Sequence, residues 1–215
     1  MNQTPYWIRA ATVAGAIAVT APATAAVTFF TSQAAFNGAA NTTVIEDFEN
    51  TGAALHTILA SFSHHGLTFT GLTGGTPFGN VYLYPPGGTE FGVGVSQPTT
   101  STVLTSNGEE HFSIGFDIAR YAVGFDAYLN GLGPLVINVF SGDTLLDSFS
   151  FPGSQADKAY LGIVSTTAIT SLEWTASGGG LVNTAIDNIA TEVPEPAGLG
   201  LLALGLGVLF RRRRG

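Results

Sequence analysis

Histidine is the first residue type in this 215-residue chain that could carry chemistry, because imidazole binds metal ions and exchanges protons near neutral pH. Two of the four histidines, His64 and His65, are adjacent. Neighbouring side chains of a β-strand point to opposite faces, so we expect these two not to reach one ion together. His56 and His111 are isolated in the sequence. The spacing of the histidines therefore does not predict a zinc site.

Carboxyl groups are the second candidates, because glycoside hydrolysis needs two of them facing each other across a cleft. Glu109 and Glu110 follow a glycine in what reads as a solvated turn. Glu173 stands next to Trp174, but no strand-borne acidic motif accompanies it. The chain has no G-x-S-x-G nucleophile motif and no cysteine. The sequence therefore predicts a protein that is not an enzyme and has no disulfide.

Aromatic side chains are the third candidates, because exposed tyrosine and tryptophan rings stack on sugars. Tyr82 and Tyr84 would share one face of a short strand within the glycine-rich stretch 71–94. We expect these two rings to contribute to a ligand-binding face. The alternative is that they are ordinary strand residues and that Trp174 belongs to the core.

Charge is unevenly distributed along the chain. Residues 26–192 hold fourteen of the fifteen acidic residues but only Arg120 and Lys158 of the seven basic ones, a formal balance of −12. Such a surface repels nucleic acid and anionic lipid headgroups. We therefore expect a domain that is soluble outside the cell and has no nucleic-acid partner.

The alternation of apolar and polar residues predicts an all-β domain. Short alternating runs are separated by Asn-Gly, Gly-Asp and Pro-Gly turn residues, and no stretch of the strand-rich region sustains a 3.6-residue period. Regularly spaced short strands are typical of an antiparallel β-sandwich of the jelly-roll type. A short helix is expected over 31–38. Strands are expected over 27–30, 42–48, 61–70 with a turn at Gly66, 81–84, 101–105, 111–118, 121–129, 135–140, 144–151, 158–164, 169–176 and 183–190.

The N-terminal segment has the features of a secretory signal peptide. One basic residue, Arg9, precedes an alanine-rich apolar run over 10–19. Small residues follow, with Ala23 and Ala25 in A-x-A spacing. The alternative is an N-terminal anchor helix, but a ten-residue apolar run is short for a stable membrane span. We predict a signal helix that is removed by cleavage after Ala25 or Ala26.

The C-terminal segment has three parts, which are a Pro-Glu-Pro interruption, an apolar run over 197–210 and four arginines before Gly215. A helix opened by Pro196 and extended by the arginine stems would reach about 25 Å, enough for a thin membrane span. The arginines should remain in the cytoplasm. The residues expected to span and orient this transmembrane helix are Leu199, Leu201, Leu202, Leu204, Leu206, Val208, Leu209, Phe210, Arg211, Arg212, Arg213 and Arg214.

The order, spacing and terminal position of these parts resemble the PEP-CTERM sorting signal. In that family the tail is read by an exosortase, a membrane-embedded cysteine transpeptidase of Gram-negative bacteria that make exopolysaccharide. The resemblance implies that Val193, Pro194, Glu195 and Pro196 form the recognition site and that cleavage occurs near them. The alternative is an ordinary C-terminal membrane anchor.

The middle of the chain is similar to PEP-CTERM ectodomains of the lectin-like jelly-roll kind. The matching pieces are Asp47-Phe48-Glu49, Val123-Gly124-Phe125-Asp126, Tyr160-Leu161-Gly162-Ile163, Ile169-Thr170-Ser171-Leu172 and Ile186-Asp187-Asn188.

That resemblance also implies a structural Ca²⁺. Jelly-roll carbohydrate-binding modules commonly hold the ion between an acidic residue near the first strand and one on the last strand. Asp47, Glu49 and Asp187 occupy such positions and offer the oxygen ligands that Ca²⁺ requires. The alternative is that Asp47 and Glu49 point to solvent and that Asp187 caps a turn.

These features divide the chain into a signal peptide over 1–25, a β-sandwich ectodomain over 26–190 and a sorting and anchor segment over 191–215. They predict an exported surface or matrix protein that is held in the inner membrane, sorted by an exosortase and associated with exopolysaccharide. The alternative is a carbohydrate-binding, lectin-like module with a structural Ca²⁺.

Overall fold

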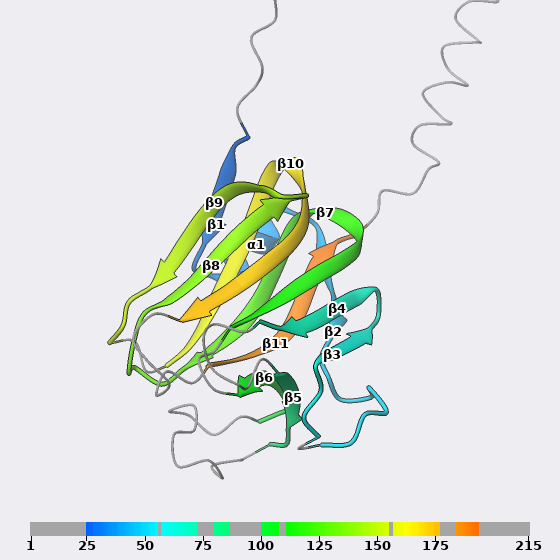
Figure 1. Cartoon of the computed structure of the whole chain (residues 1–215). Helices are drawn as coiled ribbons and strands as arrows, with labels where there is room; N and C mark the ends of the chain where they lie inside the picture. Colours follow the sequence, from blue (N-terminus) through cyan, green and yellow to red (C-terminus); the bar gives the residue numbers. More distant parts are fainter. Residues whose placement is uncertain are drawn as a thin grey trace, which may run out of the picture.

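The computed structural model describes residues 25–55, 57–72, 80–86, 100–107, 111–154, 157–176 and 184–193. Within them the chain forms a two-layer antiparallel β-sandwich with one short helix, which confirms the expected fold class (Figure 1). The elements are β1 (Val27–Phe30), α1 (Gln33–Ala39), β2 (Thr42–Glu46), β3 (Ser61–His64), β4 (Leu67–Gly71), β5 (Asn80–Tyr84), β6 (Val103–Asn107), β7 (His111–Leu129), β8 (Leu135–Ser141), β9 (Thr144–Phe151), β10 (Lys158–Ala176) and β11 (Thr184–Glu192).

The predicted signal helix and transmembrane helix fall on residues 1–24 and 194–215, outside the described part of the chain. Among the described residues, no helix has the length and apolar character needed to cross a membrane.

Two 19-residue strands, β7 and β10, run through both layers. In one layer Phe112 of β7 pairs with Trp174 of β10, and in the other layer Phe125 pairs with Leu161. The register of this ladder shifts between Val164 and Ser171 of β10, which is where the strands turn from one layer to the other. The expectation of separate strands over 111–118 and 121–129, and over 158–164 and 169–176, is therefore wrong.

The remaining strands add to these two central ones. The first layer has the order β3-β4-β7-β10-β8-β9, and the second has the order β1-β10-β7-β11. On its other side, β11 pairs with β2 along its C-terminal half and with β6 along its N-terminal half, and β5 lies beyond β6. The strand that precedes Asp47 and Glu49, β2, is thus hydrogen-bonded directly to β11, the last strand, which carries Asp187.

The core lies between the layers and is centred on Trp174, which is fully buried. Its ring centroid is 5.1 Å from that of Phe112 and 4.9 Å from that of Phe125. The three rings come from the two strands that join the layers, so their packing ties the sandwich together. Trp174 is a core residue, as the alternative interpretation of the sequence held.

Helix α1 covers the outer face of the second layer. Its Phe36 is fully buried and packs over Gly124 and Gly162, which are paired across β7 and β10. A Cβ atom on Gly162 would lie 2.5 Å from the Phe36 ring, so the ring fits because both strand residues are glycine. The helix ends at Ala39, one residue beyond the glycine at which its end was expected.

Both ends of the described chain lie at one end of the sandwich (Figure 1). Ala26 donates its backbone N–H to Thr166 Oγ1, and Thr166 donates its own N–H to the Ala26 carbonyl, both at 3.0 Å. At the other terminus the Glu192 carboxylate accepts the N–H of Ala122, which pairs with Val164 two residues before Thr166. The first and last described residues therefore leave the domain beside the bends of β7 and β10.

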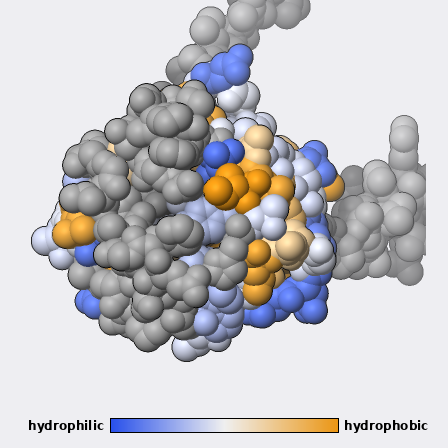
Figure 2. Space-filling model, turned by 60° about the horizontal axis from the view of Figure 1, so that its bottom comes forward, coloured by the Kyte–Doolittle hydropathy of each residue, from blue (hydrophilic) through white to orange (hydrophobic). Residues whose placement is uncertain are grey.

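The opposite end of the sandwich is shown in Figure 2. On the described surface there, hydrophobic groups lie among hydrophilic ones. The segment between β2 and β3, which Figure 1 places at this end, exposes Leu55 at 44% and Ile58 at 55%.

Candidate functional site

The predicted sorting segment begins where β11 ends. Glu192 is the last residue of β11, and its two carboxylate oxygens accept the backbone N–H groups of Tyr121 and Ala122, each at 3.0 Å. Val193 donates its N–H to the Asn41 carbonyl at 2.9 Å. These bonds fix the direction in which the tail leaves the domain. The described sheet thus extends two residues into the segment predicted over 191–215.

Most other residues of the two terminal predictions lie outside the described residues. These are Ala23 of the cleavage site and all sorting and membrane residues from Pro194 to Arg214. Ala25 and Ala26 are described and exposed, and Ala26 is already bonded into the sheet edge.

The predicted calcium ligands come from neighbouring strands. Glu46 at the end of β2 pairs with Ile189 of β11, so the residues after β2 lie next to the last strand. Asp47 is exposed, and its Oδ1 accepts the Glu49 N–H at 3.2 Å. Glu49 accepts the N–H of Thr102 at 2.7 Å. The spatial premise of the calcium prediction therefore holds, although Asp47 is turned toward solvent.

Asp187 occupies a different environment from the other two acids. It is fully buried, and it accepts hydrogen bonds from the Ser101 hydroxyl and from the Asn188 N–H. In the described part of the chain, Asp47, Glu49 and Asp187 do not bring their oxygens within 4.8 Å of one another as a group. Calcium binding therefore stays a prediction.

A polar network beside Asp187 was not foreseen from the sequence. Asn188 donates from Nδ2 to Asp126 Oδ2 at 2.9 Å and to Asp187 Oδ2 at 3.1 Å. Lys158, one of only two basic residues of the domain, contacts Asp126 Oδ2 at 2.8 Å. Although burial lowers it, the pKa of Lys158 is raised by its hydrogen bond to Asp126 and by that carboxylate's charge.

This network opens onto a hollow of about 730 Å³. Asp126 and Lys158 line one part of it, and Tyr160 and residues of β9 line the rest. The Tyr160 hydroxyl is buried and has no hydrogen-bond partner among the described residues. Burial, together with the charge of Asp126, raises the pKa of this hydroxyl. The lining residues are Thr31, Asp126, Phe149, Ser150, Phe151, Pro152, Lys158, Ala159 and Tyr160. Aromatic rings beside a charged pair and hydroxyl groups form a lining that suits a polar ligand with an apolar face.

Tyr82 and Tyr84 lie on the same face of β5, with ring centroids 6.3 Å apart. Tyr84 is only 7% exposed and packs with Tyr128 and Val103 on the outer face of the second layer. Tyr82 is half-buried at the edge of this cluster. Of the two predicted ligand residues, Tyr82 is therefore the more accessible, and a ligand role for either stays a prediction.

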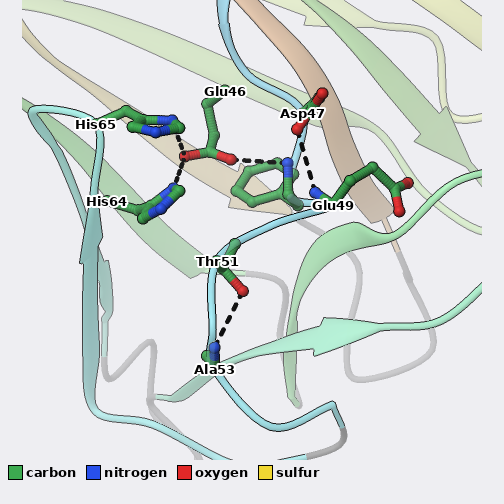
Figure 3. A network of polar contacts seen from close by, with 8 residues as sticks. Glu46, Asp47, Glu49, Thr51, Ala53, His64 and His65 are labelled. Atoms are coloured by element: carbon green, nitrogen blue, oxygen red, sulfur yellow. Dashed lines mark hydrogen bonds and ion pairs between the residues drawn. The ribbon is translucent and has the colours of Figure 1, made fainter.

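The adjacent histidines do converge, contrary to expectation. Figure 3 shows His64 and His65 pointing toward the same carboxylate, that of Glu46. Glu46 Oε2 lies 2.6 Å from His64 Nδ1 and 3.4 Å from His65 Nδ1. The expectation of opposite faces is wrong because β3 ends at His64, and His65 takes a left-handed φ of 49° in the turn before Gly66.

Glu173, the acid that stands next to Trp174 in the sequence, lies on β10, and its carboxylate faces His111 of β7. Its Oε1 is 2.9 Å from His111 Nε2, and both side chains are partly exposed. Glu109 and Glu110 lie outside the described residues.

Comparison with known proteins identifies the tail. Residues 192–214 match the PEP-CTERM protein-sorting motif, so the C-terminal segment is a PEP-CTERM sorting signal. The motif starts at Glu192, the residue that is clamped to β7. No curated protein is significantly similar to the chain.

Solved structures of family 29 carbohydrate-binding modules resemble the chain distantly. A mutant of the module CBM29-2 in complex with mannohexaose has 14% identity and a TM-score of 0.36, covering 71% of this chain and 91% of the module. Another mutant, in complex with cellulohexaose, has 15% identity and a TM-score of 0.34, covering 70% and 89%. The glycans are ligands of those modules.

Proposed function

We propose that this protein is an exported surface or matrix protein whose PEP-CTERM tail is processed by an exosortase in the inner membrane. The observation that carries the proposal is the match of residues 192–214 to the sorting motif at the end of an acidic β-sandwich. The signal peptide directs the domain across the inner membrane, and the arginines at 211–214 hold the tail in place from the cytoplasmic side.

The fixed exit of the tail supports this order of events. Val193 is bonded to Asn41, so only Pro194, Glu195 and Pro196 separate the domain from the apolar run. Three extended residues span about 10 Å. The end of the sandwich that carries the bends of β7 and β10 would therefore face the membrane before processing, and cleavage near the Pro-Glu-Pro residues releases the domain to the envelope or exopolysaccharide.

Cell fractionation tests this proposal in a strain that makes exopolysaccharide. We expect the wild-type protein in the envelope or matrix fraction and a Pro194→Ala/Glu195→Ala/Pro196→Ala variant retained in the inner membrane. Asp143→Ala, which removes an exposed acid from the turn between β8 and β9, is the matched control and should behave as wild type. Equal distribution of all three proteins, with and without the exosortase, would contradict the proposal.

A second candidate function is carbohydrate binding, and the hollow beside Asp126 favours it. The partly exposed rings of Tyr160 and Phe149 offer apolar faces to a sugar ring, while Asp126 and Lys158 can bond to its hydroxyl groups. Tyr82, for which the sequence predicts a ligand role, lies on the same outer face of the second layer.

Titration of the full-length protein in detergent with mannohexaose, cellulohexaose and the host exopolysaccharide tests this function. We expect Lys158→Ala to weaken binding about tenfold, since a hydrogen bond from a charged group contributes about 1.5 kcal/mol or more. Tyr82→Ala should weaken binding if the predicted face takes part, and Asp143→Ala should not. Affinity for none of the three glycans would contradict carbohydrate binding.

A further inference from the structure

Glu46 is a buried carboxylate whose partners are unusual for an acid at the end of a strand. Its side chain has no exposed surface. Its Oε1 accepts the Phe48 N–H at 2.7 Å, and its Oε2 faces the Nδ1 atoms of His64 and His65. A carboxylate is buried at a large cost unless positive charge or a metal ion compensates it. Among the described residues, the two imidazoles are the groups that face Oε2.

We propose that Glu46, His64 and His65 bind a transition-metal ion, with Zn²⁺ as the best match. One ligand atom from each residue lies within 4.8 Å of the other two. Two imidazole nitrogens and one carboxylate oxygen are donors that Zn²⁺ accepts, whereas Ca²⁺ and Mg²⁺ prefer oxygen alone.

The distances fit such a site with a small adjustment. Zinc bonds to nitrogen and oxygen of about 2.1 Å place neighbouring ligands of a tetrahedron roughly 3.4 Å apart. The 3.4 Å between Glu46 Oε2 and His65 Nδ1 already has this length. The 2.6 Å from Glu46 Oε2 to His64 Nδ1 is the length of a hydrogen bond, and a Zn²⁺ ion in place of the shared proton would widen this gap by roughly 0.8 Å.

The backbone turn is what makes the two histidines act together. His65 has a φ of 49°, and Gly66 follows at 78°, so the chain reverses immediately after His64. The two imidazole centroids are consequently only 3.8 Å apart. Coordination through Nδ1 leaves each Nε2 free for a hydrogen bond that would fix the ring.

The three ligands differ in exposure, so one side of the site is buried and the other side is open to solvent. Glu46 forms the buried floor, His64 is 21% exposed and His65 is 55% exposed. An ion can enter from the His65 side, and solvent can complete the coordination as the fourth ligand.

The bound ion would join the two layers at their edge. Glu46 ends β2 of the second layer, and the histidines form the tip of the β3–β4 hairpin of the first layer. A metal bridging them would oppose separation of the hairpin from β2 during unfolding. We therefore expect Zn²⁺ to stabilise the domain, independently of how the tail is sorted.

Zinc titration of the full-length protein in detergent, after removal of metals with a chelator, tests the site. We expect one Zn²⁺ per chain, a higher melting temperature with Zn²⁺, and visible absorption of four-coordinate Co²⁺ on titration with that ion. His65→Asn is the decisive variant, because asparagine tolerates the left-handed turn and the side chain is half exposed. Its affinity should fall at least about tenfold, the effect of losing even an outer-shell partner.

The second variant and the control separate this site from general histidine binding. His64→Gln should also lower zinc affinity, whereas His111→Asn, from the His111–Glu173 pair at 2.9 Å, should leave affinity unchanged. Absence of zinc binding by the wild-type chain would overturn the proposal. So would equal affinity in the wild type, His64→Gln and His65→Asn.

Discussion

Asp187 is a single residue whose surroundings set its protonation. Burial raises its pKa to about 6, the charge of Asp126 adds to this rise, and hydrogen bonds from Ser101 and Asn188 reduce it. The Lys158 ammonium group contacts Asp126 rather than Asp187. Because the ordinary value is 3.8, the folded protein holds this proton more tightly than the unfolded chain. The stability that the protonated Asp187 carboxyl group contributes is therefore fully present below about pH 4 and is lost as the pH rises through about 6.

Replacing Asp187 by asparagine should remove this pH dependence. We expect Asp187→Asn to raise the free energy of unfolding at pH 7.5 by up to about 3 kcal/mol relative to wild type, with little gain at pH 4. Urea unfolding at both pH values in a chelator, which removes any Ca²⁺ held at the predicted site, measures the difference. Asp143→Asn is the exposed control. An equal effect of Asp187→Asn at both pH values would contradict the assignment of the proton.

Sequence reasoning reached some of these residues and missed others for a physical reason. The turn at Gly66 was expected, and it already removes His65 from strand alternation, so the convergence of the histidines was within reach. The burial of Glu46 could not be predicted from the sequence, because it depends on a hairpin from the other layer. The Asp126–Lys158 contact depends in the same way on the register of β7 with β10.

At the scale of elements, most strands could be predicted from alternation and turn residues. The exception is the continuity of β7 and β10. Residues 119–120 and 165–168 contain no glycine, proline or asparagine, and the bend is made by a register shift instead of a turn. Such a shift is a property of two paired strands, so one strand's sequence cannot show it.

The packing of α1 on the second layer gives a prediction at this scale. Gly162→Ala places a Cβ 2.5 Å from the ring of Phe36, which is fully buried and cannot move away freely. We expect the free energy of unfolding to fall by about 1–3 kcal/mol. Urea titration, monitored by the fluorescence of Trp174, measures this loss. Gly38→Ala, in the same helix with open space around its Cβ position, should instead stabilise by about 0.5–1 kcal/mol. A neutral Gly162→Ala would show that α1 is not seated as described.

At the scale of the whole molecule, charge and chain path agree with the sorting proposal. The domain is strongly acidic, while four of the seven basic residues stand together at 211–214. Both ends of the described chain leave beside the bends of β7 and β10. One end of the sandwich can therefore face the membrane, while the opposite end, shown in Figure 2, and the hollow beside Asp126 remain available to partners.

The intact mass of the protein taken from its native envelope tests the central claim most directly, because it reports both termini at once. Since Ala26 is bonded to Thr166 on both its N–H and its carbonyl, we expect the mature chain to begin at Ala26. We expect it to end near Pro196 when the exosortase is present, and to retain the tail through Gly215 when the exosortase is deleted. A chain that ends at Gly215 in both strains would contradict the account.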